Sequence, residues 1–349
     1  MSGELTLREK IGQMLLVGFR GYTVQESDPI VRDIVERHIG GIILFDQEMA
    51  DTSIKGRNIQ SPAQVAALTA SLQAHAKNPL LIATDQEGGR VNRLKAAYGF
   101  PETISHEELG SRPSEETYAE AAKIARALKS VGLNFNLAPV VDLDLAPDNP
   151  IIKGKKRSFG ADPFKVAQYA SQFVAAHRAE EVLTCLKHFP GHGSARGDTH
   201  LGLVNVTDSW DKSELLPFKL LIADGWCDAI MTAHVFNAHL DPERPATLSR
   251  AVVQGLLSGQ LGFDGVVLSD DLEMKAISSQ YGLPQAIEFA LEAGIDVLCF
   301  GNNMNFDPEI GRKASDIIYQ LVDSGKIALS RIDDSCARVQ RLKQKFKLR

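Results

Sequence analysis

The sequence predicts an α/β fold, a (β/α)8 TIM barrel that forms a single domain over residues 1–349. Short runs rich in Val, Ile and Leu recur along the chain, an amphipathic helical pattern follows most of them, and no linker of distinct composition interrupts the alternation. Continuous apolar runs are typical of parallel strands that are covered on both faces. Eight strand–helix units in a chain of 349 residues match the size of such a barrel.

The expected strands lie at 14–19, 41–45, 80–85, 133–141, 182–188, 228–235, 265–270 and 294–300. The first clear helix begins with Ser61 as N-cap and Pro62 at the first helical position. The expected helices are 61–77, 115–130, 162–180, 212–224, 249–257, 283–292, 308–324 and 331–346. An open doubly wound sheet is the competing fold, but the charged stretch 85–90 is a poor match to the glycine-rich phosphate turn that it needs.

Composition limits the partners that we expect. The chain is 44% hydrophobic and 23% charged, with a net charge of −6 and a pI near 5.9, which is unlike a nucleic-acid or anionic-membrane binder. No stretch reaches the roughly 18 apolar residues of a membrane helix, and residues 1–8 do not resemble a signal peptide. The four scattered cysteines read as buried free thiols. We therefore expect a cytoplasmic monomer.

Polar side chains follow several of the expected strands. Asp85, with Glu87, Arg90 and Arg93 after it, ends the third strand; Arg157 follows the fourth; Lys187 and His188 end the fifth, and Asp198 and His200 lie in its loop; His234 ends the sixth and Asp270 the seventh. Each residue alone could be a helix cap or a solvated charge. In a barrel, however, the carboxyl ends of all strands meet at the face that carries the active site.

Asp270 is the strongest single candidate for a catalytic residue, because it follows an apolar strand directly, as a nucleophile or an electrostatic stabiliser would. The alternative is an N-cap for the segment after Leu272. Asp271 is a rival, but adjacent residues of an extended chain point to opposite sides, so we expect at most one of the two to face the pocket.

Asp198 and His200 form the second candidate pair, since residues i and i+2 of an extended chain project to the same side. A carboxylate beside an imidazole fixes its tautomer and suits it to acid–base catalysis, although a loop-bracing hydrogen bond is the alternative. His188, His192 and His200 could also suggest a zinc site. Lys187 next to His188 and the turn at Pro190 argue against it, so we expect no metal and no cofactor.

These motifs together resemble glycoside hydrolase family 3, in its single-domain β-N-acetylhexosaminidase branch. The resemblance extends over almost the whole chain and rests on Lys-His-Phe-Pro-Gly-His-Gly at 187–193 with Asp-Thr-His at 198–200. The other matching segments, in family order, are 85–91, 136–140, 157–160, 231–234 and 269–272.

The resemblance implies a retaining mechanism in which Asp270 is the nucleophile and His200, partnered by Asp198, is the general acid/base. It further implies that a sugar is held by Asp85, Arg93, Arg157, Lys187 and His188, with His234 and Met274 as lesser candidates. We interpret the glycine-rich turns at 190–193 as a hinge that lets the loop-borne His200 meet Asp270, and His192 has no assigned role.

The implied activity is exo-hydrolysis of terminal β-linked N-acetylglucosamine from small soluble glycans, above all peptidoglycan-recycling fragments that carry anhydro-muramic acid and its peptides. A β-glucosidase or an N-acetylglucosaminide phosphorylase of the same family and a catalytically silent sugar-binding protein are the alternatives. The loop 46–60 and the basic run Lys153-Gly154-Lys155-Lys156 either shape the leaving-group side or are simply solvated, so the natural aglycone stays open.

Overall fold

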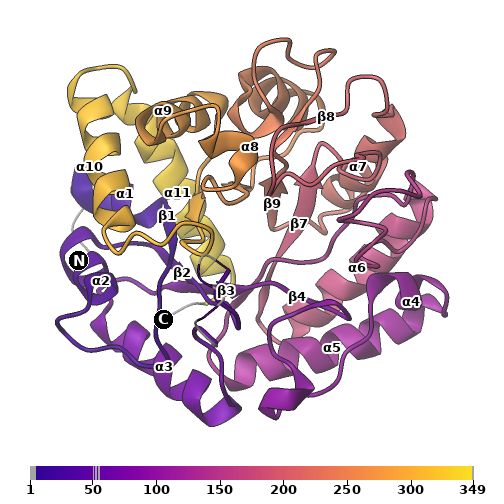
Figure 1. The fold of residues 1–349 in the computed structure, drawn as a ribbon, viewed down its shortest axis with the longest axis horizontal. Coiled ribbons are helices and arrows are strands. Elements are labelled where there is room, and N and C mark those ends of the chain that lie inside the picture. The colour runs from indigo at the N-terminus through magenta and orange to yellow at the C-terminus, as the bar shows by residue number, and fades with distance from the viewer. Residues whose placement is uncertain (1–4, 50, 52, 54–55, 348–349) are drawn as a thin grey trace.

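Eight parallel strands form a closed barrel inside a ring of helices in the computed structural model, which describes residues 5–49, 51, 53 and 56–347 (Figure 1). The strand order is β11-β9-β7-β6-β3-β2-β1-β12, so neighbours along the chain are neighbours in the barrel. A parallel bridge between Leu268 and Val297 brings β11 against β12 and closes the ring. The predicted (β/α)8 fold is confirmed.

All eight expected strands are present, some shorter than predicted. They are β1 (Leu15–Gly18), β2 (Gly41–Ile43), β3 (Leu81–Thr84), β6 (Phe135–Asn136), β7 (Leu183–Phe189), β9 (Ala229–Thr232), β11 (Val266–Ser269) and β12 (Leu298–Phe300). The largest difference is at 133–141, where only β6 and a bridge from Val140 to Lys187 remain. Pro139 interrupts this segment because it has no N–H to donate to a neighbouring strand. Two short pairs lie outside the barrel: β4 (Gln86–Gly88) with β5 (Val91–Asn92), and β8 (Val204–Asn205) with β10 (Val235–Phe236).

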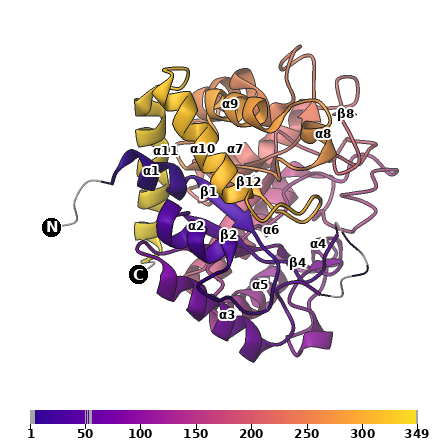
Figure 2. The same cartoon turned by 60° about the vertical axis from the view of Figure 1, so that its left-hand side comes forward.

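The helices cover the outside of the barrel (Figure 2). They are α1 (Leu7–Gln13), α2 (Pro29–Arg37), α3 (Pro62–His75), α4 (His106–Gly110), α5 (Ser114–Ser130), α6 (Pro163–Ala179), α7 (Leu216–Ala223), α8 (Lys275–Ser278), α9 (Leu283–Ala293), α10 (Ile310–Asp323) and α11 (Leu329–Lys345). The 3-10 turns are η1 (Ala96–Tyr98), η2 (Lys212–Leu215) and η3 (Ala246–Leu248), and η4 (Ala251–Gln260) is a π-helix. The expected helices are all found as helical segments, whereas α1, α2, α4 and α8 were not predicted.

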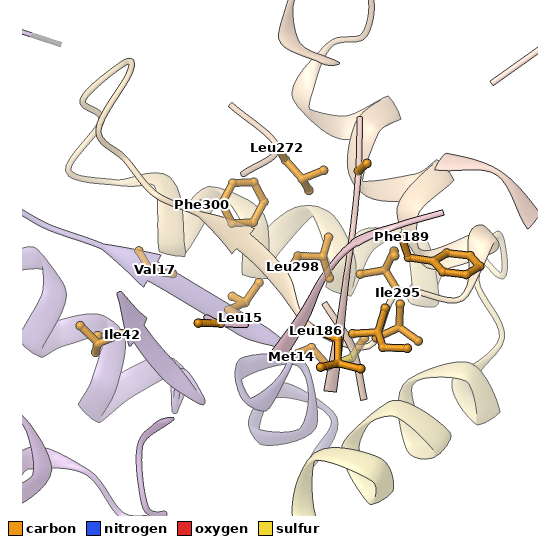
Figure 3. Close-up of a cluster of buried hydrophobic side chains, with 14 of the residues drawn as sticks. Met14, Leu15, Val17, Ile42, Leu186, Phe189, Leu272, Ile295, Leu298 and Phe300 are labelled. Atoms are coloured by element: carbon orange, nitrogen blue, oxygen red, sulfur yellow. The ribbon is translucent and has the colours of Figure 1, made fainter. Parts of the chain in front are cut away.

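Alternate strand residues build two apolar cores. Leu15 and Val17 of β1 point outward and join the layer between strands and helices, where Figure 3 shows them with Leu298 and Phe300. Leu16, between them, points into the barrel and joins an inner cluster. This alternation follows from the two-residue period of a strand, and it explains why the runs are apolar throughout.

Helix α11 closes one end of the barrel. Its Val339 and Leu342 belong to the inner cluster, and the buried amine of Lys343 donates to Gln13 Oε1 at 2.7 Å and to the carbonyl of Gly40 at 3.1 Å. Gln13 and Gly40 precede β1 and β2, so this is the amino-terminal end of the strands. The opposite, carboxyl-terminal end is therefore the one that remains open for a site.

Two further expectations concern thiols and membranes. The cysteines are free; Cys185, Cys299 and Cys336 are buried and Cys227 is partly buried, as predicted. Within the described ranges, no helix combines the length and the apolar character needed to cross a bilayer.

Candidate active site

A cavity of about 400 Å³ lies at the carboxyl ends of the barrel strands. Seven of the eight predicted site residues line it, and the eighth, Asp198, binds one of them from behind. The lining residues are Asp85, Arg90, Val91, Arg93, Ile151, Lys155, Arg157, Lys187, His188, His192, Thr199, His200, Met231 and Asp270.

Lys187 is the central cation of the cavity floor. Its side chain is 2% exposed, and its amine lies 2.8 Å from Asp85 Oδ1 and 2.8 Å from Glu87 Oε1. Burial by itself would lower the pKa of Lys187, but the two carboxylates outweigh burial and raise that pKa above its usual value. Arg93 approaches the other oxygen of Asp85 at 3.3 Å. These contacts fix Asp85 as an ionised acceptor at the edge of the cavity.

Arg157 forms a forked pair with Glu87, through Nε at 2.8 Å and Nη2 at 2.7 Å. Burial opposes the ionisation of Glu87, but Arg157 and Lys187 together keep its pKa well below the usual range. Nη2 of Arg157 also lies 3.2 Å from His188 Nε2, and His188 Nδ1 lies 2.6 Å from Asp142. Donation from Nδ1 to Asp142 leaves Nε2 as the acceptor for Arg157.

Asp142 was not among the predicted site residues, and Glu87 was named after the third strand without a role in the site. Asp142 lies directly after the apolar Val140 and Val141, which is the same signal that identified Asp85 and Asp270, whereas Glu87 lies two residues beyond Asp85. Lys187 and His188 both face the cavity although they are neighbours in β7. The pairing of β7 with β9 shifts register between Lys187 and Phe189, and this irregularity breaks the usual alternation of sides.

Asp270 follows β11 and lines the cavity together with Asp85, which follows β3, four strands away in the barrel order. Burial would raise its pKa, but the imidazoles of His234, His188 and His200 and the N–H of Asp271 outweigh it and lower the pKa to about 2. The N–H of Asp271 donates to Asp270 Oδ1 at 2.8 Å. Asp270 is therefore an ionised carboxylate at neutral pH.

Two expectations about its neighbours are corrected. His234 does not line the cavity; it is fully buried and holds Thr247 Oγ1 at 2.8 Å and the carbonyl of Asp271 at 2.9 Å. Asp271 does reach a pocket, because the chain turns after Ser269 and no longer alternates as a strand does. That pocket is a smaller one beside the main cavity, so Asp270 alone of the two faces the main cavity.

The smaller pocket, of about 90 Å³, shares Asp270, Asp85, Arg93, His200 and Met231 with the main cavity. Four of the six methionines of the chain line it. These are Met49, Met231, Met274 and Met304, beside Phe45, Ile43 and Leu137. The pocket therefore combines an apolar wall with direct access to the carboxylate of Asp270. Met274, a lesser sugar-binding candidate from the sequence, lines this apolar wall and does not line the main cavity.

His200 and Asp198 are in contact. Asp198 Oδ1 accepts from the N–H of His200 at 2.9 Å and lies 2.7 Å from its Nδ1. The bond to the N–H two residues on makes this an Asx turn rather than the extended segment that the spacing suggested. At the tip of the loop, the carbonyl of Thr199 accepts from the N–H of Ala276 at 3.1 Å, which joins the loop to the segment after Asp270.

The base of this loop, where a hinge was expected, is packed inside the protein. Residues 188–195 are buried, whereas Arg196 is exposed and Gly197, Asp198 and His200 are partly exposed. His192 lies in the buried part, and both of its ring nitrogens lack a hydrogen-bond partner in the part of the chain that the structure describes. Burial, with the nearby His188, lowers the pKa of His192 to about 4, so its ring is neutral.

The histidines of this loop are metal ligands by residue type. Nδ1 of His188 and Nδ1 of His200 are each engaged by an aspartate. Over residues 5–49, 51, 53 and 56–347, no group of three or more His, Cys, Asp and Glu side chains is arranged to hold a metal ion.

The paired carboxylate and imidazole, with a charged wall around them, are typical of a site for polar, uncharged substrates such as sugars. The model of the glycosyl hydrolase family 3 N-terminal domain matches residues 6–342. The chain belongs to glycosyl hydrolase family 3. The resemblance seen in the motifs is thereby confirmed.

Two enzymes with known structures share this fold closely. A glycoside hydrolase family 3 β-N-acetylglucosaminidase from Paenibacillus sp. FPU-7 superimposes with a TM-score of 0.90 at 39% identity, covering 99% of this chain and 63% of that one. A β-N-acetylhexosaminidase from Beutenbergia cavernae gives 0.87 at 30% identity, covering 98% and 99%.

Two relatives found by sequence comparison are named β-hexosaminidases. β-Hexosaminidase A from Pseudoalteromonas piscicida is 33% identical over 98% of this chain, and a β-hexosaminidase from Tolumonas auensis is 38% identical over 80% of it. The match covers 62% of the Pseudoalteromonas protein and 80% of the Tolumonas protein. The chain thus spans less than two thirds of some relatives and nearly all of the Beutenbergia enzyme.

Proposed function

We propose that this protein is a retaining exo-β-N-acetylglucosaminidase. The observation that carries the proposal is the placement of two groups on one cavity: an ionised carboxylate, Asp270, and an imidazole, His200, that is oriented by Asp198. One group can attack a sugar carbon while the other handles the proton of the departing oxygen. The names of the relatives agree with this activity.

The proposed reaction has two steps. In the first, an Asp270 oxygen bonds to the anomeric carbon, the bond from that carbon to the leaving oxygen breaks, and His200 gives that oxygen a proton. In the second, His200 removes a proton from water, the water oxygen bonds to the anomeric carbon, and the Asp270 carboxylate is released. Two displacements retain the anomeric configuration. Asp198 keeps the Nδ1 proton in place, so that Nε2 exchanges the proton.

The charged wall would hold the terminal sugar. Asp85 accepts and Lys187, Arg93 and Arg157 donate, which matches the mixed donors and acceptors of sugar hydroxyls. Because these groups are already paired with one another, their positions are set before a sugar arrives.

The methionine-lined pocket supports an N-acetylated sugar over a glucoside. It opens beside Asp270, and carbon 2 of a bound sugar is adjacent to the carbon that Asp270 attacks. The methyl of a 2-acetamido group can therefore enter an apolar pocket where a lone hydroxyl would leave the apolar wall unfilled.

Lys155 supports an acidic leaving group, such as the lactyl carboxylate of a muramic-acid residue in peptidoglycan-recycling fragments. Of the three lysines in the run 153–156, Lys153 and Lys156 pair with Glu107, while Lys155 lines the cavity. Arg90 lines the cavity too and donates to the carbonyl of Gly154 at 2.7 Å. A cytoplasmic location for this recycling is part of the proposal and is supported by the free thiols.

Labelling tests the nucleophile. A slow fluorinated N-acetylglucosaminyl substrate should trap a covalent adduct, and mass spectrometry of peptides should place it on Asp270. An adduct on any other residue would sink the mechanism. Initial rates on aryl N-acetylglucosaminides and aryl glucosides separate the proposed enzyme from a glucosidase. The same rates with and without phosphate separate a hydrolase from a phosphorylase. If neither sugar is turned over, the protein is a sugar-binding protein without activity.

A further inference from the structure

Glu214, on the turn η2, is a buried carboxylate that belongs to neither cavity. Its side chain lies against the start of the loop that carries His200, and the residue is 1% exposed. Its Oε2 accepts from the N–H of Gly193 at 2.8 Å and of Ser194 at 3.4 Å, and its Oε1 accepts from Ser194 Oγ at 2.6 Å. No cation pairs with this carboxylate among the described residues, and the hydrogen bonds that its two oxygens accept come from Gly193 and Ser194 of the loop.

The opposite side of the same segment is held by another buried carboxylate. Asp142 Oδ1 accepts from the N–H of His192 at 2.8 Å, and Asn149 Nδ2 donates to the carbonyls of His192 at 2.8 Å and Gly193 at 3.1 Å. The segment is therefore clamped between Glu214 and the Asp142–Asn149 side.

Glycines make this fit possible. Gly191 has a φ of +120°, and a Cβ on it would lie 2.5 Å from Glu214 Cβ. A Cβ on Gly193 would lie 1.9 Å from the carbonyl oxygen of Leu143 on the other side. The backbone of the loop thus fills the space between its two supports, and movement of either support would move the loop.

Beyond Ala195 the chain becomes more exposed until Thr199, where the bond to Ala276 holds the tip. His200 is thus positioned from two ends: the tip contact and the clamped base. We propose that Glu214 is a positioning residue that fixes the base of this loop and thereby places His200 for proton transfer to the leaving group. This inference rests on the proposed function, because it assigns Glu214 to the acid/base step.

The chemistry of Glu214 allows a conservative replacement. Burial raises its pKa to about 7, against hydrogen bonds from Ser194 and Gly193, and the charge of Asp142 across the loop raises it further. Protonated and ionised forms therefore both occur near neutral pH. The amide of Gln has the shape of the protonated form and can accept from the backbone N–H groups while donating to Ser194 Oγ.

The test uses two substrates that differ in their need for the acid: di-N-acetylchitobiose, with a poor leaving group, and 4-nitrophenyl N-acetyl-β-glucosaminide, with a good one. Glu214→Ala should lower kcat/KM for the disaccharide about tenfold or more beyond its effect on the aryl substrate, since general acid catalysis contributes roughly 10²–10⁴-fold. His200→Ala removes the proposed acid itself, so it measures the largest difference between the two substrates that loss of the acid can produce. Glu214→Gln should restore most of the disaccharide activity.

Lys212→Ala, an exposed change on the same turn, is the matched control and should leave both rates unchanged. If Glu214→Ala does not fold, Ser194→Ala removes one of the three bonds and should show the same imbalance, smaller in size. Equal losses on both substrates, or no rescue by Gln, would overturn the positioning role while the hydrolase assignment stands. Absence of turnover by the wild-type protein on both substrates would instead overturn the proposed function.

Discussion

At the scale of single residues, the site is a set of buried charges that neutralise one another. Lys187 stands between Asp85 and Glu87, and Glu87 is shared with Arg157. Removing one member of such a set takes a partner from another buried charge. The resulting loss of stability is larger than the net stabilisation that the ion pair provides. The same pairing keeps the groups that are proposed to bind the sugar in fixed positions, so stability and the proposed function depend on the same contacts.

Lys187→Met should therefore lower both stability and activity. The variant takes the shared cation away from Asp85 and Glu87, which keep only one arginine partner each, and we expect the free energy of unfolding to fall by about 3–5 kcal/mol. Urea denaturation at neutral pH measures it. Lys129→Met is the control, because Lys129 pairs with Glu181 at 2.9 Å with both side chains 49% exposed, and surface pairs contribute about 0–1 kcal/mol. Similar losses in the two variants would contradict the buried network.

At the scale of elements, the loop after β7 has two parts with different backbone requirements. Its first part is pressed against neighbouring backbone, as the 1.9 Å approach of a Cβ on Gly193 to Leu143 shows. Its later part has room, and a Cβ on Gly202 would meet nothing within 4 Å. Glycine is thus required for close packing at one position and not at the other.

Gly193→Ala and Gly202→Ala form a matched pair that separates these parts. Gly193→Ala must push the loop away from Leu143, so it should lower kcat/KM together with the melting temperature. Gly202→Ala should leave both near wild type, because Gly-to-Ala changes at unstrained positions alter stability by only about 0.4–1 kcal/mol and often favourably. Circular dichroism melts and assays on the aryl substrate compare the two, and equal behaviour would refute the close fit.

The elements also show what the sequence could and could not predict. The barrel strands were predictable because each is covered on both faces and so reads as a continuous apolar run. Two missed helices had local signals as well: Thr6 and Glu9 form a capping box at α1, and Asp28-Pro29 begins α2 as Asp162-Pro163 begins α6. A helix at 249–257 was predicted as well, but the apolar spacing did not indicate that this helix, η4, is a π-helix.

For the site, residue types were predictable and partners were not. The strand-end rule placed Asp85, Lys187 and Asp270 on one rim. The pairing of carboxylates with cations depends on contacts between residues far apart in the sequence, such as Glu87 and Arg157. No local spacing in the sequence encodes these contacts. Glu214 illustrates the limit, since the sequence places it only within the expected helix 212–224, and its contact with the loop at Gly193 exists only in the folded chain.

At the scale of the whole molecule, the two ends of the barrel have different tasks. The carboxyl end carries the site, and the amino end is sealed by α11, whose Lys343 is buried beside Gln13 and Gly40 with no carboxylate within ion-pairing distance among the described residues. Burial lowers the pKa of Lys343 to about 7. The seal therefore contains a group that loses its proton far more readily than a free lysine does.

Lys343→Met should reveal this group in the pH dependence of stability. Between about pH 7 and about pH 10 the unfolded chain keeps the proton of Lys343 while the folded chain has lost it, because a free lysine has a pKa near 10.4. The unfolded state then binds more protons, so this group makes the wild type more stable as the pH rises through that window. The free energy of unfolding of the wild type minus that of the variant should increase accordingly in urea melts. Val339→Ala, one turn earlier on the same helix, changes no charge, so its free energy of unfolding should change with pH as that of the wild type does. If the free energy of unfolding of Lys343→Met also changes with pH as the wild type's does, the amine keeps its proton inside the fold.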